Sequence, residues 1–201
     1  MISFSETAAS EPRLILASGS PRRRDLLREA GLEPMVIPPD VEEFGAGAFP
    51  PRELCLTNAR LKGLAISVNY PDDYVIASDT VVALDGVVYG KPESEEEAAF
   101  NLREFRGRVH EVMTGVIILQ GERICEFVET SFVKFKEFDG SVIQSYLSKV
   151  PVLDKAGGYA IQDHGEWLVE SIEGDYHNIV GLPLTKVLAQ LAQMGFPLPK
   201  E

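Results

Sequence analysis

Serines and arginines cluster where a helix is expected to begin. The stretch Ser18-Gly19-Ser20-Pro21-Arg22-Arg23-Arg24 follows a short apolar run, with Ser20 as a candidate N-cap and Pro21 in the first helical position. A helix N-terminus already carries partial positive charge, so three arginines there are unfavourable unless an anion binds beside them. We therefore predict that the segment binds phosphate through Ser18, Ser20, Arg22 and Arg23. A solvated basic turn is the alternative, and it suits Arg24 best.

An acidic residue interrupts the apolar stretch YVIASDTVVAL at residues 74–84. A carboxylate such as that of Asp79 is costly to bury there unless it is paired, hydrogen-bonded or bound to a metal ion. Glu42 and Glu43 follow the Pro38-Pro39 stop, and either one together with Asp79 would supply oxygen ligands for a divalent cation. A buried ion pair or a strand-end cap is the structural alternative.

Two lysines and one glycine-rich segment complete the candidate chemistry. Lys62 lies four residues after Asn58 on the same predicted helix face, and Lys91 precedes Pro92 just after a predicted hairpin. Residues 154–162 (DKAGGYAIQ) contain paired glycines that permit a ligand to approach the backbone closely. Solvent-exposed lysines and an ordinary loop are the alternatives on spacing alone.

Several common catalytic motifs are missing from the sequence. The three histidines, His110, His164 and His177, show no metal-ligand spacing and are expected in core or hydrogen-bonding roles. There is no Walker P-loop, GxGxxG, HExxH or GxSxG motif. This argues against dehydrogenase, zinc-protease and serine-hydrolase chemistry.

Apolar and amphipathic segments alternate along the chain. We expect strands at residues 13–17, 35–37, 74–84, 87–89, 109–119, 123–135, 167–172 and 176–180. We expect helices from Ser20 to Gly31, at 52–68, from Ser94 to Gly107, at 141–149 and at 183–194. Turn signals at 85–86, 120–121 and 173–175 make several strand pairs hairpins, which cannot be parallel. The pattern predicts an α/β fold with a mixed sheet.

Length and composition limit the class of protein further. The chain has 201 residues, 45% hydrophobic and 25% charged, which is enough for one sizeable domain that needs no disulfide or structural metal. Its net charge of −12 repels nucleic-acid backbones and anionic lipid, so we expect no nucleic-acid binding. No apolar stretch reaches the roughly 20 residues of a membrane span.

The N-terminus and the cysteines bear on location. Residues 1–12 lack the basic start and apolar run of a signal peptide, so we expect a frayed extension on a cytoplasmic protein. Cys55 and Cys125 form no CxxC pair and are expected as free thiols.

Six blocks of sequence resemble one known family and occur in that family's order. They are ASGSPRR (17–23), SDTVV (78–82), GKP (90–92), GRVHEVMTGV (107–116), DKAGGYAIQ (154–162) and HNIVGLPL (177–184). Over nearly all of residues 14–191 the chain is similar to the Maf-type nucleoside triphosphate pyrophosphatases, first described as septum-formation inhibitors. The resemblance implies one Maf-like domain over residues 1–201, related to the inosine triphosphate pyrophosphatases, with two lobes flanking a cleft.

The resemblance also implies an activity. It is hydrolysis of a nucleoside triphosphate to the monophosphate and pyrophosphate, with Mg²⁺ or Mn²⁺ as cofactor. Asp79 stands where the family has its catalytic base, and the family's substrate-discriminating positions are Arg22, Thr80 and Gln162. This Arg/Thr/Gln set resembles the branch that acts on dTTP and UTP rather than the branch that acts on 7-methyl-GTP. A homodimer is implied as well.

Site chemistry suggests roles for the remaining candidates. We expect Lys62 and Lys91 to offset charge that develops on the phosphate oxygens, and Glu43 to bind the cation together with Asp79. Gln162 and Thr80 are expected to recognise O4 and N3–H of a pyrimidine by complementary hydrogen bonds.

Three positions depart from the family's common pattern. Ala160 and Asp163 stand where many members have glycine, and Gly63 stands where alanine is usual. The first two bear on nucleobase preference more than on the reaction. A nucleotide-binding regulator of cell division without significant turnover is the main alternative function, because the same anion site would serve it.

Overall fold

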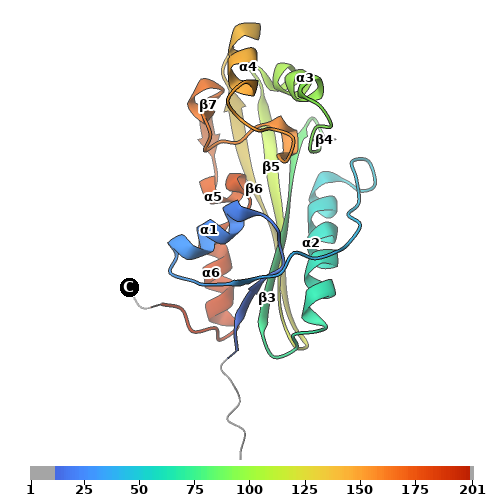
Figure 1. The fold of residues 1–201 in the computed structure, drawn as a ribbon, viewed down its shortest axis with the longest axis vertical. Helices are drawn as coiled ribbons and strands as arrows, with labels where there is room; N and C mark the ends of the chain where they lie inside the picture. The colour runs from blue at the N-terminus through green and yellow to red at the C-terminus, as the bar shows by residue number, and fades with distance from the viewer. Residues whose placement is uncertain (1–11, 200–201) are drawn as a thin grey trace, which may run out of the picture.

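The chain folds around one mixed β-sheet (Figure 1), and the central strands of this sheet are buried on both faces. The computed structural model describes residues 12–199, so the frayed extension expected at 1–12 falls almost wholly outside the described residues. Within that range the strands are β1 (Leu14–Leu16), β2 (Met35–Val36), β3 (Tyr74–Leu84), β4 (Val87–Tyr89), β5 (Val109–Gln120), β6 (Arg123–Phe135) and β7 (Val169–Glu173). The helices are α1 (Pro21–Glu29), α2 (Pro51–Ser67), α3 (Glu95–Phe105), α4 (Gly140–Leu147), α5 (Tyr176–Val180) and α6 (Leu184–Gln193), with 3-10 turns η1 (Ala156–Gly158) and η2 (Gly165–Trp167).

The sheet confirms the predicted mixture of parallel and antiparallel pairs. Its order is β2-β1-β3-β5-β6-β7, with β4 also paired to β3. β1 runs parallel to β2 and β3, whereas the predicted hairpins make β3–β4 and β5–β6 antiparallel. Asp85 and Gly86 adopt φ values of 50° and 79°, the left-handed conformation that a tight hairpin turn requires.

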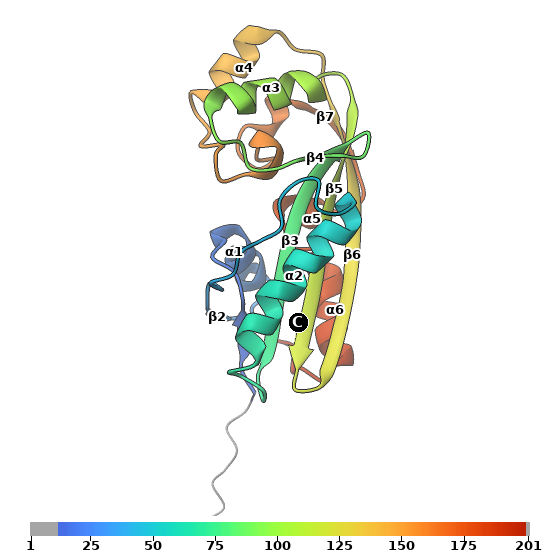
Figure 2. The same ribbon diagram turned by 90° about the vertical axis from the view of Figure 1, so that its right-hand side faces the viewer.

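The long strands β3, β5 and β6 extend through both halves of the molecule (Figure 2). In one half α2 covers one sheet face, while α1 and α6 cover the other around Leu16, Ile76 and Val116. In the other half α3 and α4 enclose a second core around Phe105, Phe135 and further buried residues. The expected two lobes therefore share one continuous sheet.

A gap in the sheet places the functional residues. On one side of β3, β1 pairs with it as far as Ile76, and β4 pairs with it only from Val82 onward. No described strand lies beside residues 77–81 on that side, and the gap falls between the two lobes. Successive side chains of a strand point to opposite faces of the sheet. Asp79 and Thr80 therefore project from opposite faces beside this unpaired part of β3.

One strand prediction is wrong, and another is shifted. Residues 176–180 form helix α5, because the Asp175 side chain accepts a hydrogen bond from the His177 N–H and caps the helix. Gly181, at φ 124°, ends that helix. The strand expected at 167–172 begins only at Val169, since η2 occupies the preceding residues.

The paired glycines also act differently from the expectation. Gly157 and Gly158 do not line the cavity described below. An added Cβ at Gly157 would lie 3.2 Å from Val82 and Phe105, and one at Gly158 would lie 3.2 Å from Ala98. The glycines therefore let this turn pack against β3 and α3 rather than against a ligand.

Candidate active site

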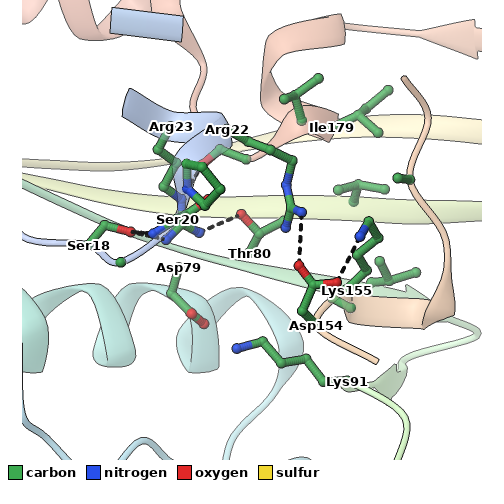
Figure 3. A pocket seen from close by; sticks show the side chains of 18 of the residues that line it. Ser18, Ser20, Arg22, Arg23, Asp79, Thr80, Lys91, Asp154, Lys155 and Ile179 are labelled. Carbon is green, nitrogen blue, oxygen red and sulfur yellow. Dashed lines mark hydrogen bonds and ion pairs between the residues drawn. The ribbon is translucent and has the colours of Figure 1, made fainter. Parts of the chain in front are cut away.

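One cavity between the lobes gathers all of the predicted site residues. It has a volume of about 420 Å³ and lies at the gap beside β3 (Figure 3). Its lining includes Ser18, Ser20, Arg22, Arg23, Glu43, Lys62, Asp79, Thr80, Lys91 and Gln162. Glu42, the alternative to Glu43, is not among the lining residues. The structure thus brings together residues from positions 18 to 162, while their individual roles stay predictions.

The N-terminus of α1 faces this cavity without a side-chain cap. Ser20 is the N-cap residue, but its hydroxyl makes no capping bond. The Ser20 N–H instead donates to the Ser18 hydroxyl at 3.1 Å. Since the first N–H groups of a helix lack partners within the helix, an anion in the cavity would meet free donors here.

Arg23 presents a guanidinium that contacts only neutral groups. It donates to the Gly181 carbonyl at 2.9 Å and to the Ser18 and Thr80 hydroxyls at 3.2 Å each. Among residues 12–199 no carboxylate lies within ion-pair distance of it. Burial lowers the pKa of Arg23, although Asp79 partly opposes this effect. A partly buried cation without a contacting counter-ion is typical of a site that receives an anion.

Lys62 joins the two acidic residues of the site. Its ammonium lies 2.7 Å from Asp79 Oδ1 and 2.6 Å from Glu43 Oε2. Lys62 and Asp79 are buried on the α2 side of the sheet, whereas Glu43 comes from the exposed loop before α2. The structure therefore shows the buried ion pair that was the structural alternative for Asp79, while a catalytic or metal-binding role for this carboxylate stays a prediction.

Asn58 is a site residue to which sequence reasoning assigned no role. Its side chain accepts from the Phe44 N–H at 2.9 Å and donates to the Phe44 carbonyl at 3.0 Å. It also donates to Asp79 Oδ2 at 3.4 Å. Asn58 does not line the cavity, so it holds the Glu43 loop beside Asp79 from behind. Its spacing of four residues from Lys62 was the available signal.

The donor set suits a divalent cation. Glu43 and Asp79 direct carboxylate oxygens at one shared cation, the Lys62 ammonium. No group of three or more acidic, histidine or cysteine ligands gathers among the described residues. Mg²⁺ commonly takes only one or two protein carboxylates and completes its shell with substrate oxygens and water. These two residues therefore fit such an ion in the presence of a phosphorylated ligand.

A second group of charged side chains lines the cavity. Arg22 donates to Asp154 at 3.3 Å, and Asp154 also accepts from Lys155 at 2.7 Å (Figure 3). Burial opposes ionisation of Asp154, but the bonds from Lys155 and Arg22 outweigh it and lower its pKa. Lys91 is exposed and has no ion-pair partner within the described part of the chain. Arg24 pairs with Asp25 outside the cavity, as its surface role predicts.

The far wall of the cavity is largely apolar. It consists of Val82, Val112, Tyr159, Ala160, Ile161 and Ile179, with Gln162 beside them. The buried Tyr146 hydroxyl donates to the Ala160 carbonyl at 3.0 Å and accepts from the Ala160 N–H at 2.9 Å. This pair of bonds fixes the backbone leading to Gln162. Asp163, in contrast, lies outside the lining, so it adds no charge to this wall.

The cavity differs in charge from the rest of the molecule. Five cationic side chains line it, but only three acidic ones, although the chain carries a net charge of −12. Phosphates at one end and an aromatic ring at the other match this distribution. Fold and site together define an α/β protein with a pocket whose charges suit a phosphorylated organic molecule.

Comparison with known proteins makes this class specific. The family model described as "Maf-like protein" matches residues 13–194, and the chain belongs to this family. It is 43% identical over 185 residues to a dTTP/UTP pyrophosphatase of Akkermansia muciniphila, covering 92% of this chain and 98% of that protein. It is 44% identical over 188 residues to a dTTP/UTP pyrophosphatase of Pyrococcus abyssi, covering 93% and 99%. A Pyrococcus furiosus relative with the same name is 42% identical, covering 94% and 98%.

The helices are short or polar compared with a membrane span. Within residues 12–199, none is both long enough and apolar enough to traverse a bilayer.

Proposed function

We propose that the protein hydrolyses dTTP and UTP to the nucleoside monophosphate and pyrophosphate. Family membership supports this function, as do relatives named dTTP/UTP pyrophosphatase that match more than nine-tenths of the chain. The observation that carries it is one cavity in which Arg23 lacks a contacting counter-ion and Asp79 is bonded to Lys62. A nucleotide-binding regulator of cell division would need the arginines, but it would not need the Asp79 arrangement.

The triphosphate binds at the α1 end of the cavity. Ser18, Ser20 and the free N–H groups of α1 donate to its oxygens, and Arg22 and Arg23 offset its charge. Arg22 exchanges its bond with Asp154 for a phosphate oxygen, while Lys155 keeps Asp154 paired. Lys91 approaches the same oxygens from the hairpin side.

Mg²⁺ or Mn²⁺ would be held by Glu43 and Asp79 together with phosphate oxygens. When bound, the cation supplies positive charge that stabilises the phosphate oxygens during bond cleavage. Lys62 contributes a second positive charge from its position between the two carboxylates.

Asp79 orients the attacking water and accepts its proton. The water oxygen forms a bond to the α-phosphorus, and the bond from that phosphorus to the bridging oxygen breaks. Pyrophosphate leaves with the electron pair of the broken bond, and Lys62 and Lys91 stabilise the charge that it carries. The apolar wall holds the nucleobase, and Gln162 and Thr80 recognise it in this proposal.

Replacement of Asp79, the proposed catalytic base, tests this function. Asp79→Asn keeps the side-chain size but cannot take up the proton, so turnover of dTTP and UTP falls by about 10²- to 10⁴-fold while nucleotide binding is retained. Pyrophosphate release and equilibrium binding are measured with Mn²⁺ present. Asp72→Asn, at an exposed aspartate outside the cavity, is the matched control and keeps normal turnover. Near-normal turnover in Asp79→Asn rejects the assigned role.

A screen of natural and modified triphosphates separates the enzyme from the regulator. The enzyme releases pyrophosphate steadily at micromolar substrate, whereas a regulator binds the nucleotide and leaves it intact. The same screen addresses physiological purpose, since preferred cleavage of a modified nucleotide indicates cleansing of the nucleotide pool.

We also propose a cytoplasmic homodimer that binds no nucleic acid. The acidic net charge supports the last point. Light scattering on the purified protein measures the mass of the assembly, and a monomer mass contradicts the dimer.

A further inference from the structure

A chain of hydrogen bonds leads from the cavity into the sheet. Arg23 Nη2 donates to Thr80 Oγ1 at 3.2 Å, the bond drawn in Figure 3. Thr80 Oγ1 lies 2.9 Å from Thr114 Oγ1 on the neighbouring strand β5. Thr114 Oγ1 in turn lies 3.0 Å from the backbone carbonyl oxygen of Asn178 in α5.

The Asn178 backbone carbonyl determines the donor and the acceptor in every hydrogen bond of this series. A carbonyl only accepts, so the single hydroxyl hydrogen of Thr114 is donated to Asn178. Thr114 must then accept from Thr80, which uses the single hydroxyl hydrogen of Thr80. Thr80 therefore has only lone pairs left, and one of them already accepts from Arg23. Toward a ligand, the Thr80 hydroxyl can act only as an acceptor.

Asn178, the last residue of this hydrogen-bond series, is held in place by its own side chain. Asn178 is fully buried, and its amide donates to the Val112 carbonyl and the Ser131 hydroxyl, both at 3.0 Å. Thr114 is fully buried as well. The Asn178 backbone carbonyl also accepts from the Gly181 N–H at 3.1 Å. Reversing the hydrogen bonds would still leave the Thr114 hydroxyl oxygen and this carbonyl oxygen 3.0 Å apart in a buried place with no hydrogen between them, which is unfavourable.

We infer that Thr114 is a specificity-determining positioning residue, which makes Thr80 select an imide N–H on the substrate base. This inference rests on the proposed function and deepens it. Uracil and thymine carry a hydrogen on N3, whereas cytosine has a lone pair at N3. A cytosine ring would bring two lone pairs together at Thr80, so the site discriminates against CTP.

The position of Thr80 supports the base as its partner. Thr80 lies between Arg23, at the phosphate end, and Val82, in the apolar wall. Phosphate oxygens are acceptors and cannot bond to an acceptor-only hydroxyl. The donors that dTTP and UTP share are N3–H and the 3′-hydroxyl. Of these two, the imide fits a cavity wall that is apolar and ends at Gln162.

Two variants of Thr114 test the inference. Thr114→Val keeps the shape but releases the Thr80 hydrogen, which can then be donated to N3 of cytosine. The ratio of kcat/KM for UTP to that for CTP falls by about tenfold or more, through a gain for CTP. Thr114→Ser retains the hydroxyl and restores the wild-type ratio. An unchanged ratio in Thr114→Val overturns the inference.

A matched control separates specificity from general loosening. Tyr74→Phe also removes a buried hydroxyl that donates to a carbonyl, that of Met194 at 2.9 Å, but it lies away from the cavity. Its UTP-to-CTP ratio stays at the wild-type value, and an equal fall there overturns the inference. The inference is also overturned if the wild type cleaves 3′-deoxy-UTP more slowly than UTP and Thr114→Val removes this difference. The partner of Thr80 is then the 3′-hydroxyl of the sugar.

A binding experiment distinguishes failure of the proposed function from failure of this inference. If the wild type cleaves neither UTP nor CTP, the same variants are compared by equilibrium binding of the α,β-methylene analogues of both nucleotides. A UTP preference of about tenfold that Thr114→Val removes supports the inference without catalysis. Equal affinities in the wild type overturn it.

Discussion

At the scale of single residues, the acidic part of the site depends on a clamp made by α2. Asn58 and Lys62 stand four residues apart, and both bond to Asp79 and to the loop that carries Glu43. Asn58 holds the loop through both polar groups of the Phe44 backbone. The exposed Glu43 would otherwise be free to move away from Asp79.

Removing this clamp should lower turnover more than affinity. In Asn58→Ala, Glu43 and Asp79 lose their fixed separation, so kcat for UTP falls by about 10- to 100-fold. KM changes little, because Asn58 does not touch the cavity. Steady-state kinetics measure both constants. Asn101→Ala, at another buried helical asparagine outside the cavity, is the control with wild-type kinetics. A raised KM at unchanged kcat contradicts the clamp.

Residue types and the family resemblance together predicted ten residues of the cavity lining, but not the apolar wall or the contacts between side chains. The charged and hydroxyl residues stand in short motifs, whereas Thr80 and Gln162 were predicted from the resemblance. The bonds made by Asn58 and the ion pair between Arg22 and Asp154 join distant parts of the chain. Such pairs depend on the folded path of the loops, which residue spacing does not reveal.

At the scale of elements, the site depends on how closely α2 approaches the sheet. An added Cβ at Gly115 of β5 would lie 2.6 Å from backbone atoms of Cys55 and Leu56 in α2. Gly63 of α2 is constrained too, since its Cβ would lie 2.7 Å from Ile117 Cγ2. These contacts favour glycine at position 63 of this chain.

Gly115→Ala should therefore weaken both the fold and the site. The backbone of α2 must move away from β5, which costs about 3 kcal/mol of unfolding free energy and withdraws Lys62 from Asp79. Urea denaturation and UTP turnover measure the two effects. Gly140→Ala, where an added Cβ meets nothing within 4 Å, is the control and loses neither. Wild-type stability in Gly115→Ala would show that α2 can adjust without cost.

Elements with strong local signals were predicted well. Hairpin turns at Asp85-Gly86 and beside Gly121, and the N-cap at Ser94, appear as expected. Residues 176–180 were predicted as a strand because YHNIV is rich in aromatic and β-branched residues. The cap from Asp175 and the buried bonds of Asn178 override that local preference.

At the scale of the whole molecule, the second lobe encloses one unusual titratable group. His110 is buried, stacks on Phe105 with ring centres 4.5 Å apart, and bonds to the Tyr159 hydroxyl at 2.8 Å. Its other ring nitrogen has no partner among the described residues. Burial lowers the pKa of His110 to about 3, so the folded protein keeps the ring neutral. The imidazole is thus a core residue, as its lack of metal-ligand spacing predicts.

The low pKa of His110 links global stability to pH. In the unfolded chain His110 takes up a proton near its ordinary pKa of about 6.5, but the folded protein does not until about pH 3. Its contribution is complete above pH 6.5 and is lost on acidification, by about 1.4 kcal/mol per pH unit toward pH 3. Urea denaturation at pH 7, 6, 5 and 4 measures the slope for the wild type and for His110→Phe, which cannot bind the proton. The slope of the variant is smaller by one proton. Equal slopes in wild type and His110→Phe would mean that the lobe opens to admit the proton before the protein unfolds.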